Sequence, residues 1–169
     1  MATVVFENAE AMAIDVNPAP ALAEATLATS AYLLGLMDAA LEMTVDYLKT
    51  RVQFGRTISN FQVLQHMAVD LKLETQVTRA SVEDAALRWD RYGPTPETYA
   101  AVSRTKARAS QAALKLTRDV IQLHGGIGFT DEHDIGLYLR KTIVTGAQFG
   151  SADCHRANYA RLKPLEEEA

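Results

Sequence analysis

The chain has 169 residues, of which 48% are apolar and 22% are charged, a balance that excludes a disordered chain and suits one globular domain. The formal net charge is −4 without any strongly basic stretch, so nucleic acid is not an expected partner. No apolar run reaches the roughly 20 residues of a membrane span, and residues 1–10 lack the basic start of a signal peptide. The single cysteine, Cys154, excludes an internal disulfide. We therefore expect a cytoplasmic protein.

The first third of the sequence predicts one long helix after a short extended run. Residues Thr3 to Phe6 are β-like but too few to form a sheet, and the prolines of the segment 17–20 break the chain after them. From about Ala21 to Arg51 there is no further proline, and apolar side chains recur at helical spacings of three, four and seven, namely Leu27, Ala31, Leu34, Leu41, Val45 and Leu48.

A second helix is predicted from Phe61 to Trp89, with Ser59 or Asn60 as its N-cap and Gly93 with Pro94 as its stop. Its apolar positions alternate at spacings of three and four along its whole length. They are Phe61, Leu64, Ala68, Leu71, Thr75, Thr78, Val82, Ala85 and Trp89.

The last part of the sequence predicts one more long helix and two short ones. Thr95 is a suitable N-cap before Pro96, and the glycine pair Gly125 and Gly126 is a C-terminal stop. A shorter helix is expected over 131–143 and a final one over 151–162, separated by the glycine-containing stretch 145–150. Together the helices predict an all-α protein, an antiparallel four-helix-type bundle with a short additional C-terminal helix.

Metal and nucleophilic chemistry find no support in the sequence. A di-iron bundle would need an acidic residue three positions before a histidine, but those positions hold Val63, Ile121, Thr130 and Ala152. No two histidines are four residues apart, which also argues against zinc, so we expect no metal site. Cys154 is best interpreted as a small packed side chain, because no neighbouring pattern activates it.

Two segments stand out as candidate binding elements, and both are at predicted helix ends. The first runs from Tyr47 to Arg56 and leads into the sequence Phe-Gln at 61–62; the second runs from Gln122 to Thr130. Free backbone donors and glycines at helix ends let an anionic ligand approach closely. Arg51 offers a planar fork for phosphate, and Phe54 offers an aromatic face for a base. Taken alone, each segment is better interpreted as helix caps and turn residues.

Taken together, these motifs resemble the flavin-dependent acyl-CoA dehydrogenases. The shared pattern is Arg-x-Gln-Phe-Gly at 51–55, Phe-Gln at 61–62, and Gln-x-x-Gly-Gly-x-Gly at 122–128. The resemblance covers essentially the whole chain, as the C-terminal helical domain of that family. It implies that FAD lies across a subunit interface and that this chain holds the ADP half through Arg51, Phe54, Gln62, Gln122, Gly125 and Gly126.

The same resemblance implies a domain organisation. Residues 1–18 would be a remnant of the preceding β-domain with its linker, and Thr3 to Phe6 would be the last strand of that β-domain. Residues 19–163 would be the helical bundle, and 164–169 would be an acidic tail. The chain would then be a fragment, an excised domain or a separately encoded piece.

The substrate side of the family's site departs from the pattern. Phe149 occupies the place of the glutamate base, and a phenylalanine cannot accept a proton. The alternative base position on the first helix is Ala25, with Glu24 beside it as a weak candidate. The family arginine that pairs with the CoA phosphates corresponds to Thr26, and the aspartate that commonly follows the late arginine corresponds to Lys141.

This division predicts a non-catalytic partner subunit, because the positions that hold FAD are kept while the substrate positions are lost. Segment 149–156 looks like the partner-type subunits of heteromeric bacterial acyl-CoA dehydrogenases, including those that act on steroid side-chain thioesters. The expected partners are acyl-CoA dehydrogenase-type subunits in a homo- or hetero-oligomer, with the acyl-CoA bound mainly by the partner. Two alternatives stay open: a catalytic domain that uses Glu24 as a relocated base, and an assembly module without flavin.

Overall fold

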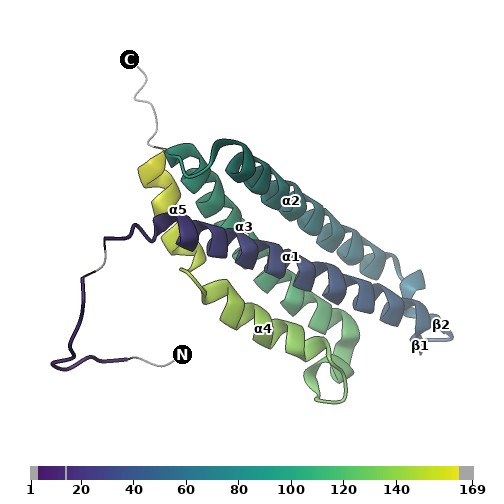
Figure 1. The fold of residues 1–169 in the computed structure, drawn as a ribbon. Helices are drawn as coiled ribbons and strands as arrows, with labels where there is room; N and C mark the ends of the chain where they lie inside the picture. The colour runs from purple at the N-terminus through teal and green to yellow at the C-terminus, as the bar shows by residue number, and fades with distance from the viewer. Residues whose placement is uncertain (1–3, 14, 164–169) are drawn as a thin grey trace.

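The computed structural model describes residues 4–13 and 15–163, and five helices form an antiparallel bundle (Figure 1). The three long helices are α1 (Ala19–Thr50), α2 (Gln62–Tyr92) and α3 (Pro96–His124), and the two short ones are α4 (Ile135–Ala147) and α5 (Ala152–Leu162). Two 3-10 turns, η1 (Ile58–Asn60) and η2 (Gly125–Phe129), connect them, together with the two-stranded hairpin β1 (Val52–Gln53) and β2 (Arg56–Thr57). The all-α fold class predicted from the sequence is confirmed.

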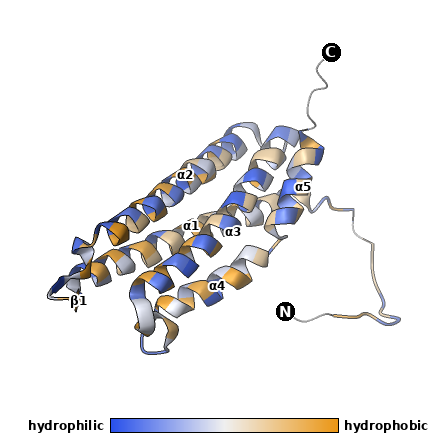
Figure 2. Ribbon diagram, turned by 180° about the vertical axis from the view of Figure 1, so that it is seen from behind, coloured by the Kyte–Doolittle hydropathy of each residue, from blue (hydrophilic) through white to orange (hydrophobic). Residues whose placement is uncertain are grey.

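Helix α3 is the centre of the bundle and packs against each of the four other helices. Its alanines are buried on several faces, and small side chains allow neighbouring helices to approach closely from more than one side. The main core joins four helices, through Leu33, Met37 and Leu41 of α1, Leu71 of α2, Leu116 and Val120 of α3, and Ile135 of α4. In Figure 2 hydrophilic and hydrophobic stretches of ribbon alternate along the whole length of α2.

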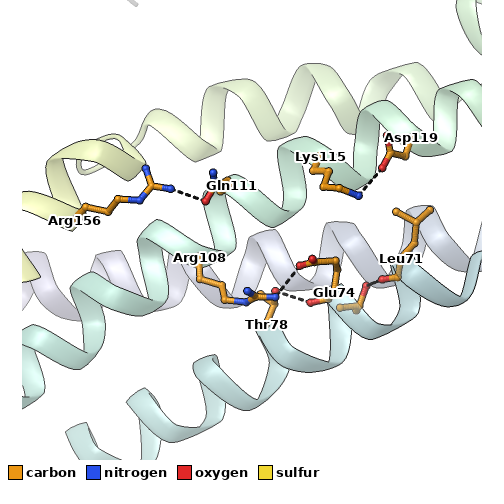
Figure 3. A network of polar contacts seen from close by, with 9 residues as sticks. Leu71, Glu74, Thr78, Arg108, Gln111, Lys115, Asp119 and Arg156 are labelled. Atoms are coloured by element: carbon orange, nitrogen blue, oxygen red, sulfur yellow. Dashed lines mark hydrogen bonds and ion pairs between the residues drawn. The ribbon is translucent and has the colours of Figure 1, made fainter. Parts of the chain in front are cut away.

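Polar contacts also join the outer helices to α3 (Figure 3). Arg108 of α3 donates to the carboxylate of Glu74 on α2 over 2.7 Å, and Arg156 of α5 donates to the amide oxygen of Gln111 over 2.5 Å. The Arg108–Glu74 pair is partly exposed, and ion pairs of this kind contribute roughly 0 to 1 kcal/mol to stability. The bundle is therefore held mainly by its apolar core.

The predicted boundary between α2 and α3 is confirmed in atomic detail. Gly93 ends α2 with a φ of 63°, and Thr95 caps α3 in a reciprocal box with Thr98. The hydroxyl of Thr95 accepts from the amide of Thr98 over 3.3 Å, while the hydroxyl of Thr98 accepts from the amide of Thr95 over 2.8 Å. The side chains of two residues thus satisfy two backbone donors that the first turn of α3 would otherwise leave free.

We expect Thr95→Ala to lower the free energy of unfolding by about 0.5–2 kcal/mol, because the amide of Thr98 loses its acceptor. The measurement is urea denaturation followed by circular dichroism. Thr50→Ala is the matched control, since that exposed hydroxyl bonds only to carbonyl groups of its own helix. Equal losses in the two variants would contradict a specific role for the cap.

Two predicted helix starts are wrong. Helix α2 begins at Gln62 after Phe61, and neither Ser59 nor Asn60 caps it. The side chain of Asn60 donates instead to the hydroxyl of Thr57 over 2.7 Å, within the turn that precedes the helix. Helix α4 begins at Ile135 and not at Asp131, whose carboxylate pairs with Arg140.

The predicted strand at the start of the chain does not form within the described residues. Residues Val4 to Phe6 form no strand with any described part of the chain and are exposed, because a single strand has no neighbour here to pair with. Thr3, the first residue of the predicted strand, and the acidic tail at 164–169 lie outside the described residues.

Candidate functional site

The motif at 51–57 folds as a tight β-hairpin that the helical pattern did not predict. Arg51 ends α1, after which β1 and β2 pair antiparallel with Gln53 opposite Arg56. Phe54 and Gly55 form the two-residue loop with φ angles of 54° and 77°, and positive φ at both positions is the mark of a type I′ turn. Such a φ is strained for a bulky residue, and Phe54 is nevertheless 90% exposed at the tip.

The second motif forms the end of α3 and the turn η2, and its three glycines are there for different reasons. Gly125 ends the helix with a φ of 63°, which favours glycine. A Cβ on Gly128 would lie 2.6 Å from the carbonyl oxygen of Ile121, so packing demands glycine there. Gly126 has neither a positive φ nor a neighbour within 4 Å of an added Cβ, so its bare backbone faces open space.

The structure brings the two motifs to the same end of the bundle, around one cleft of about 610 Å³. Of the six predicted cofactor residues, Arg51, Gln122, Gly125 and Gly126 line this cleft. Phe54 and Gln62 do not; Phe54 is at the tip of the hairpin and Gln62 is the exposed first residue of α2. The cleft therefore collects four of the six residues and leaves two beside it.

Arg51 is available to a ligand. Its side chain is exposed and makes no hydrogen bond or ion pair with any residue between 4 and 13 or 15 and 163. Arg56 of β2 places its guanidinium 4.1 Å from the ring centre of Phe61 instead. A guanidinium free of protein partners at the mouth of a cleft suits an anionic group.

A cluster of three rings, which no sequence motif predicted, supports the glycine turn. The ring of Tyr47 stacks on His124 with centroids 4.5 Å apart, and His133 lies 4.5 Å from His124. The hydroxyl of Tyr47 donates to the carbonyl oxygen of His124 over 3.2 Å, directly before Gly125. Tyr47 is on α1 near Arg51, whereas both histidines come much later in the chain. Tertiary packing brings the three rings together, so their contact could not be predicted from the sequence.

His124 is held as a neutral donor. Its Nδ1 donates to the carbonyl oxygen of Val120 over 2.7 Å, which leaves the buried Nε2 without a partner among the described residues. Burial lowers the pKa of His124; the bond to Val120 opposes this shift, and the nearby His133 adds to it. The ring therefore acts as packing for the turn at neutral pH, and no proton transfer is assigned to it.

Two of the positions that depart from the family's substrate site lie at the opposite end of the bundle. Phe149 and Thr26 line a second cavity of about 440 Å³ together with Tyr99 and His155. Glu24 does not line it, and its carboxylate accepts a hydrogen bond from the indole of Trp89 over 3.2 Å. The candidate for a relocated base on α1 thus contacts α2 instead of this cavity.

Lys141 is also turned away from this cavity. Its amino group lies 5.4 Å from the ring centre of Tyr32, on the exposed side of α4. In the two described ranges, 4–13 and 15–163, no group of three or more His, Cys, Asp or Glu side chains is placed to hold a metal ion. None of the helices described is long and apolar enough to cross a membrane.

Comparison with known proteins shows the family to which this fold belongs. The family model for the acyl-CoA dehydrogenase C-terminal domain matches residues 19–162, which is all five helices. The chain belongs to the acyl-CoA dehydrogenase family. It corresponds to the C-terminal domain of that family, as the sequence motifs predicted.

The relatives of this domain are longer proteins. Acyl-CoA dehydrogenase IpdE2 of Mycobacterium tuberculosis is 39% identical over 152 residues, which are 89% of this chain and 43% of that protein. Butyryl-CoA dehydrogenase from Megasphaera elsdenii superposes with a TM-score of 0.78 at 27% identity, over 83% of this chain and 36% of the other. A structure named Tcur3481-Tcur3483 steroid ACAD gives 0.77 at 30% identity, over 85% and 39%. The chain thus spans less than half the length of these relatives.

Proposed function

We propose that this acyl-CoA dehydrogenase domain holds the ADP half of an FAD at a subunit interface and leaves the base and the acyl-CoA to a partner subunit. The observation that carries the proposal is the cleft in which Arg51, Gln122 and the bare backbone of Gly126 meet. The assembly would carry out α,β-dehydrogenation of an acyl-CoA thioester. When bound, the flavin supplies the acceptor for the hydride that leaves the substrate.

The donors of the cleft fit a dinucleotide diphosphate. Arg51 can bind two phosphate oxygens in one plane, since no other residue of the described chain occupies its guanidinium. Gln122 offers a neutral amide at the end of α3, and Gly126 leaves room for a phosphate or ribose to contact its backbone. Phe54, exposed at the turn tip beside the cleft, would pack against the adenine in the assembled complex.

The far end of the bundle supports a division of labour between subunits. Phe149 offers no proton acceptor at the cavity that it lines with Thr26, and Glu24 is engaged with Trp89. A second subunit that carries its own base would complete such a site. The structural relative named Tcur3481-Tcur3483 joins two protein designations, which is consistent with a hetero-oligomeric arrangement.

The alternative without flavin rests on the exposed apolar side chains of α2. Val69, Leu73 and Val77 recur every four residues on its outer face and are each more than half exposed. Such a face favours association with another subunit. It is compatible with either function, so only the presence of FAD separates an assembly module from a cofactor-binding subunit.

Native mass spectrometry of the complex purified with this chain tests the proposal. We expect one assembly that contains this chain, a second acyl-CoA dehydrogenase-type subunit and FAD, and no dehydrogenase activity from the chain alone. An assembly without FAD would favour the module. If the purified chain with an acyl-CoA reduced an electron acceptor, the proposal that this chain lacks the catalytic base would be refuted.

A pair of glycine variants separates ligand contact from folding. We expect Gly126→Ala to fold as the wild type and to bind less FAD in the complex, because the added methyl group points into open space that a ligand would occupy. Gly128→Ala should instead destabilise the domain, since its Cβ would overlap the carbonyl of Ile121. Thermal unfolding and flavin absorbance measure the two effects; normal flavin content in Gly126→Ala would count against contact at this glycine.

A further inference from the structure

Lys106, in the middle of α3, is fully buried and has no acidic partner among the described residues. Its amino group donates to the hydroxyl of Ser110 over 3.1 Å, to the carbonyl oxygen of Gly146 over 2.8 Å, and to that of Gly150 over 3.4 Å. An ammonium group has three donors, and three acceptors surround this one. Burial lowers the pKa of Lys106 to about 8, so the group still keeps its three protons at pH 7.

The acceptors of Lys106 belong to the end of α4 and the turn that follows it. Gly146 is in the last turn of α4, where carbonyl groups have no helical partner, and Ser110 also donates to its oxygen over 3.2 Å. Gly150 is at the next bend, with a φ of 114°. Lys106 therefore donates, from a neighbouring helix, to two partly buried carbonyl groups at the end of α4 and in the turn after it.

His155 holds the same turn from its other side. Its Nε2 donates to the carbonyl oxygen of Phe149 over 3.0 Å, so two buried side chains of α3 and α5 hold two successive carbonyl groups. Phe149 has a φ of 57°, a strained value for a large side chain that persists only where the surroundings enforce it. The hydrogen bonds to the carbonyl groups of Phe149 and Gly150 hold this strained backbone conformation in place.

We propose that Lys106 is a positioning residue for the turn Phe149–Gly150, and that it fixes, together with His155, the place of the residue 149 side chain at the end of the bundle. The turn forms one wall of the 440 Å³ cavity, so Lys106 acts on that cavity through the backbone without lining it. The inference concerns contacts within this chain and does not rest on the proposed binding of FAD.

Hydrogen exchange of backbone amides tests the inference on the purified chain at pH 7. We expect Lys106→Met to raise exchange at residues 148–155 at least tenfold while exchange within α2 stays as in the wild type. Lys115→Met is the matched control, an exposed lysine of the same helix that pairs with Asp119. Unchanged exchange at 148–155, or an equal rise throughout α2, would overturn the role of Lys106.

Two further measurements keep the test decisive if Lys106→Met does not fold. Ser110→Ala removes one acceptor of Lys106 and one donor to Gly146, and we expect a smaller rise confined to the same residues; no rise there would overturn the inference. His155→Leu leaves Lys106 intact and removes the bond to Phe149. We expect it to raise exchange in the same segment, and a rise elsewhere only would contradict the joint role.

A pH series on Lys106→Met, where it folds, checks that the buried group is an amine that titrates. Between about pH 8 and the ordinary pKa of 10.5, the unfolded chain binds more protons at Lys106 than the folded chain does. The free energy of unfolding of the wild type should therefore rise with pH in this window, relative to the variant. His155 is the titratable group bonded to the same turn; burial lowers its pKa, so it stays neutral across the window. A flat difference would contradict the buried position of Lys106.

Discussion

Arg51→Ala should lower the affinity of the assembled complex for FAD by roughly ten- to a hundredfold, the loss expected for one charge-assisted bond to phosphate. The guanidinium is exposed at the mouth of the cleft and has no competing partner among the described residues, so the full interaction is available to a ligand. Arg51→Lys should restore only part of the affinity, because an ammonium cannot bind two oxygens in one plane. Phe54→Ala should cost somewhat less than Arg51→Ala, through lost packing against the adenine.

The measurement is the flavin absorbance of the reconstituted complex, with circular dichroism as the folding control. Neither Arg51 nor Phe54 belongs to the core, so the helical signal should stay unchanged. Arg56→Ala is the matched control: it removes an arginine of the same hairpin that contacts Phe61 and does not line the cleft. If Arg51→Ala and Arg56→Ala retained equal flavin, the assembly module would replace the proposed function.

Leu116→Ala should give a large loss of stability, about 2.7–5 kcal/mol of unfolding free energy. Leu116 is fully buried on α3, in the core cluster that joins α1, α2, α3 and α4. Since four helices surround it, the cavity left by the substitution cannot collapse by the shift of one neighbour. Urea denaturation measures the change.

Leu87→Ala is the control for this substitution. Leu87 is a leucine of α2 that is 69% exposed, and its truncation should change the stability of the isolated chain by less than about 0.5 kcal/mol. A loss in Leu116→Ala that did not exceed the control would mean that α3 is not the centre of the core. The comparison also separates the core from the outer face of α2, which is expected to matter only in an assembly.

The helix ends that could be predicted from the sequence are those set by local chemistry. Thr95 with Pro96, and the glycines 93 and 125, act through their own backbone angles and nearest amides, so the sequence contains the whole cause. Asp131 also looks like a helix start, but its carboxylate is taken by Arg140 nine residues away, an interaction that only the folded turn creates. The hairpin at 52–57 is too short for any strand period to reveal it.

The same distinction between local causes and tertiary contacts applies to the candidate site. Arg51, Gln122, Gly125 and Gly126 could be predicted through a motif that carries their spacing, and the structure brings them to one cleft. Lys106 could not, because the sequence around it is that of an ordinary polar helix position. Its burial depends on α4 and α5 folding over α3, and on carbonyl groups forty and more residues later in the chain.

The length of the helices separates the cleft from the cavity at Phe149. Thr26 and Arg51 are 25 residues apart near the two ends of α1, which at a rise of 1.5 Å per residue is about 37 Å. Substitutions this far apart, without shared neighbours, change the free energy additively. The residues of one end can therefore be exchanged in evolution without any compensating change at the other, so a helical bundle of this length can lose one activity and retain another within a single cooperative fold.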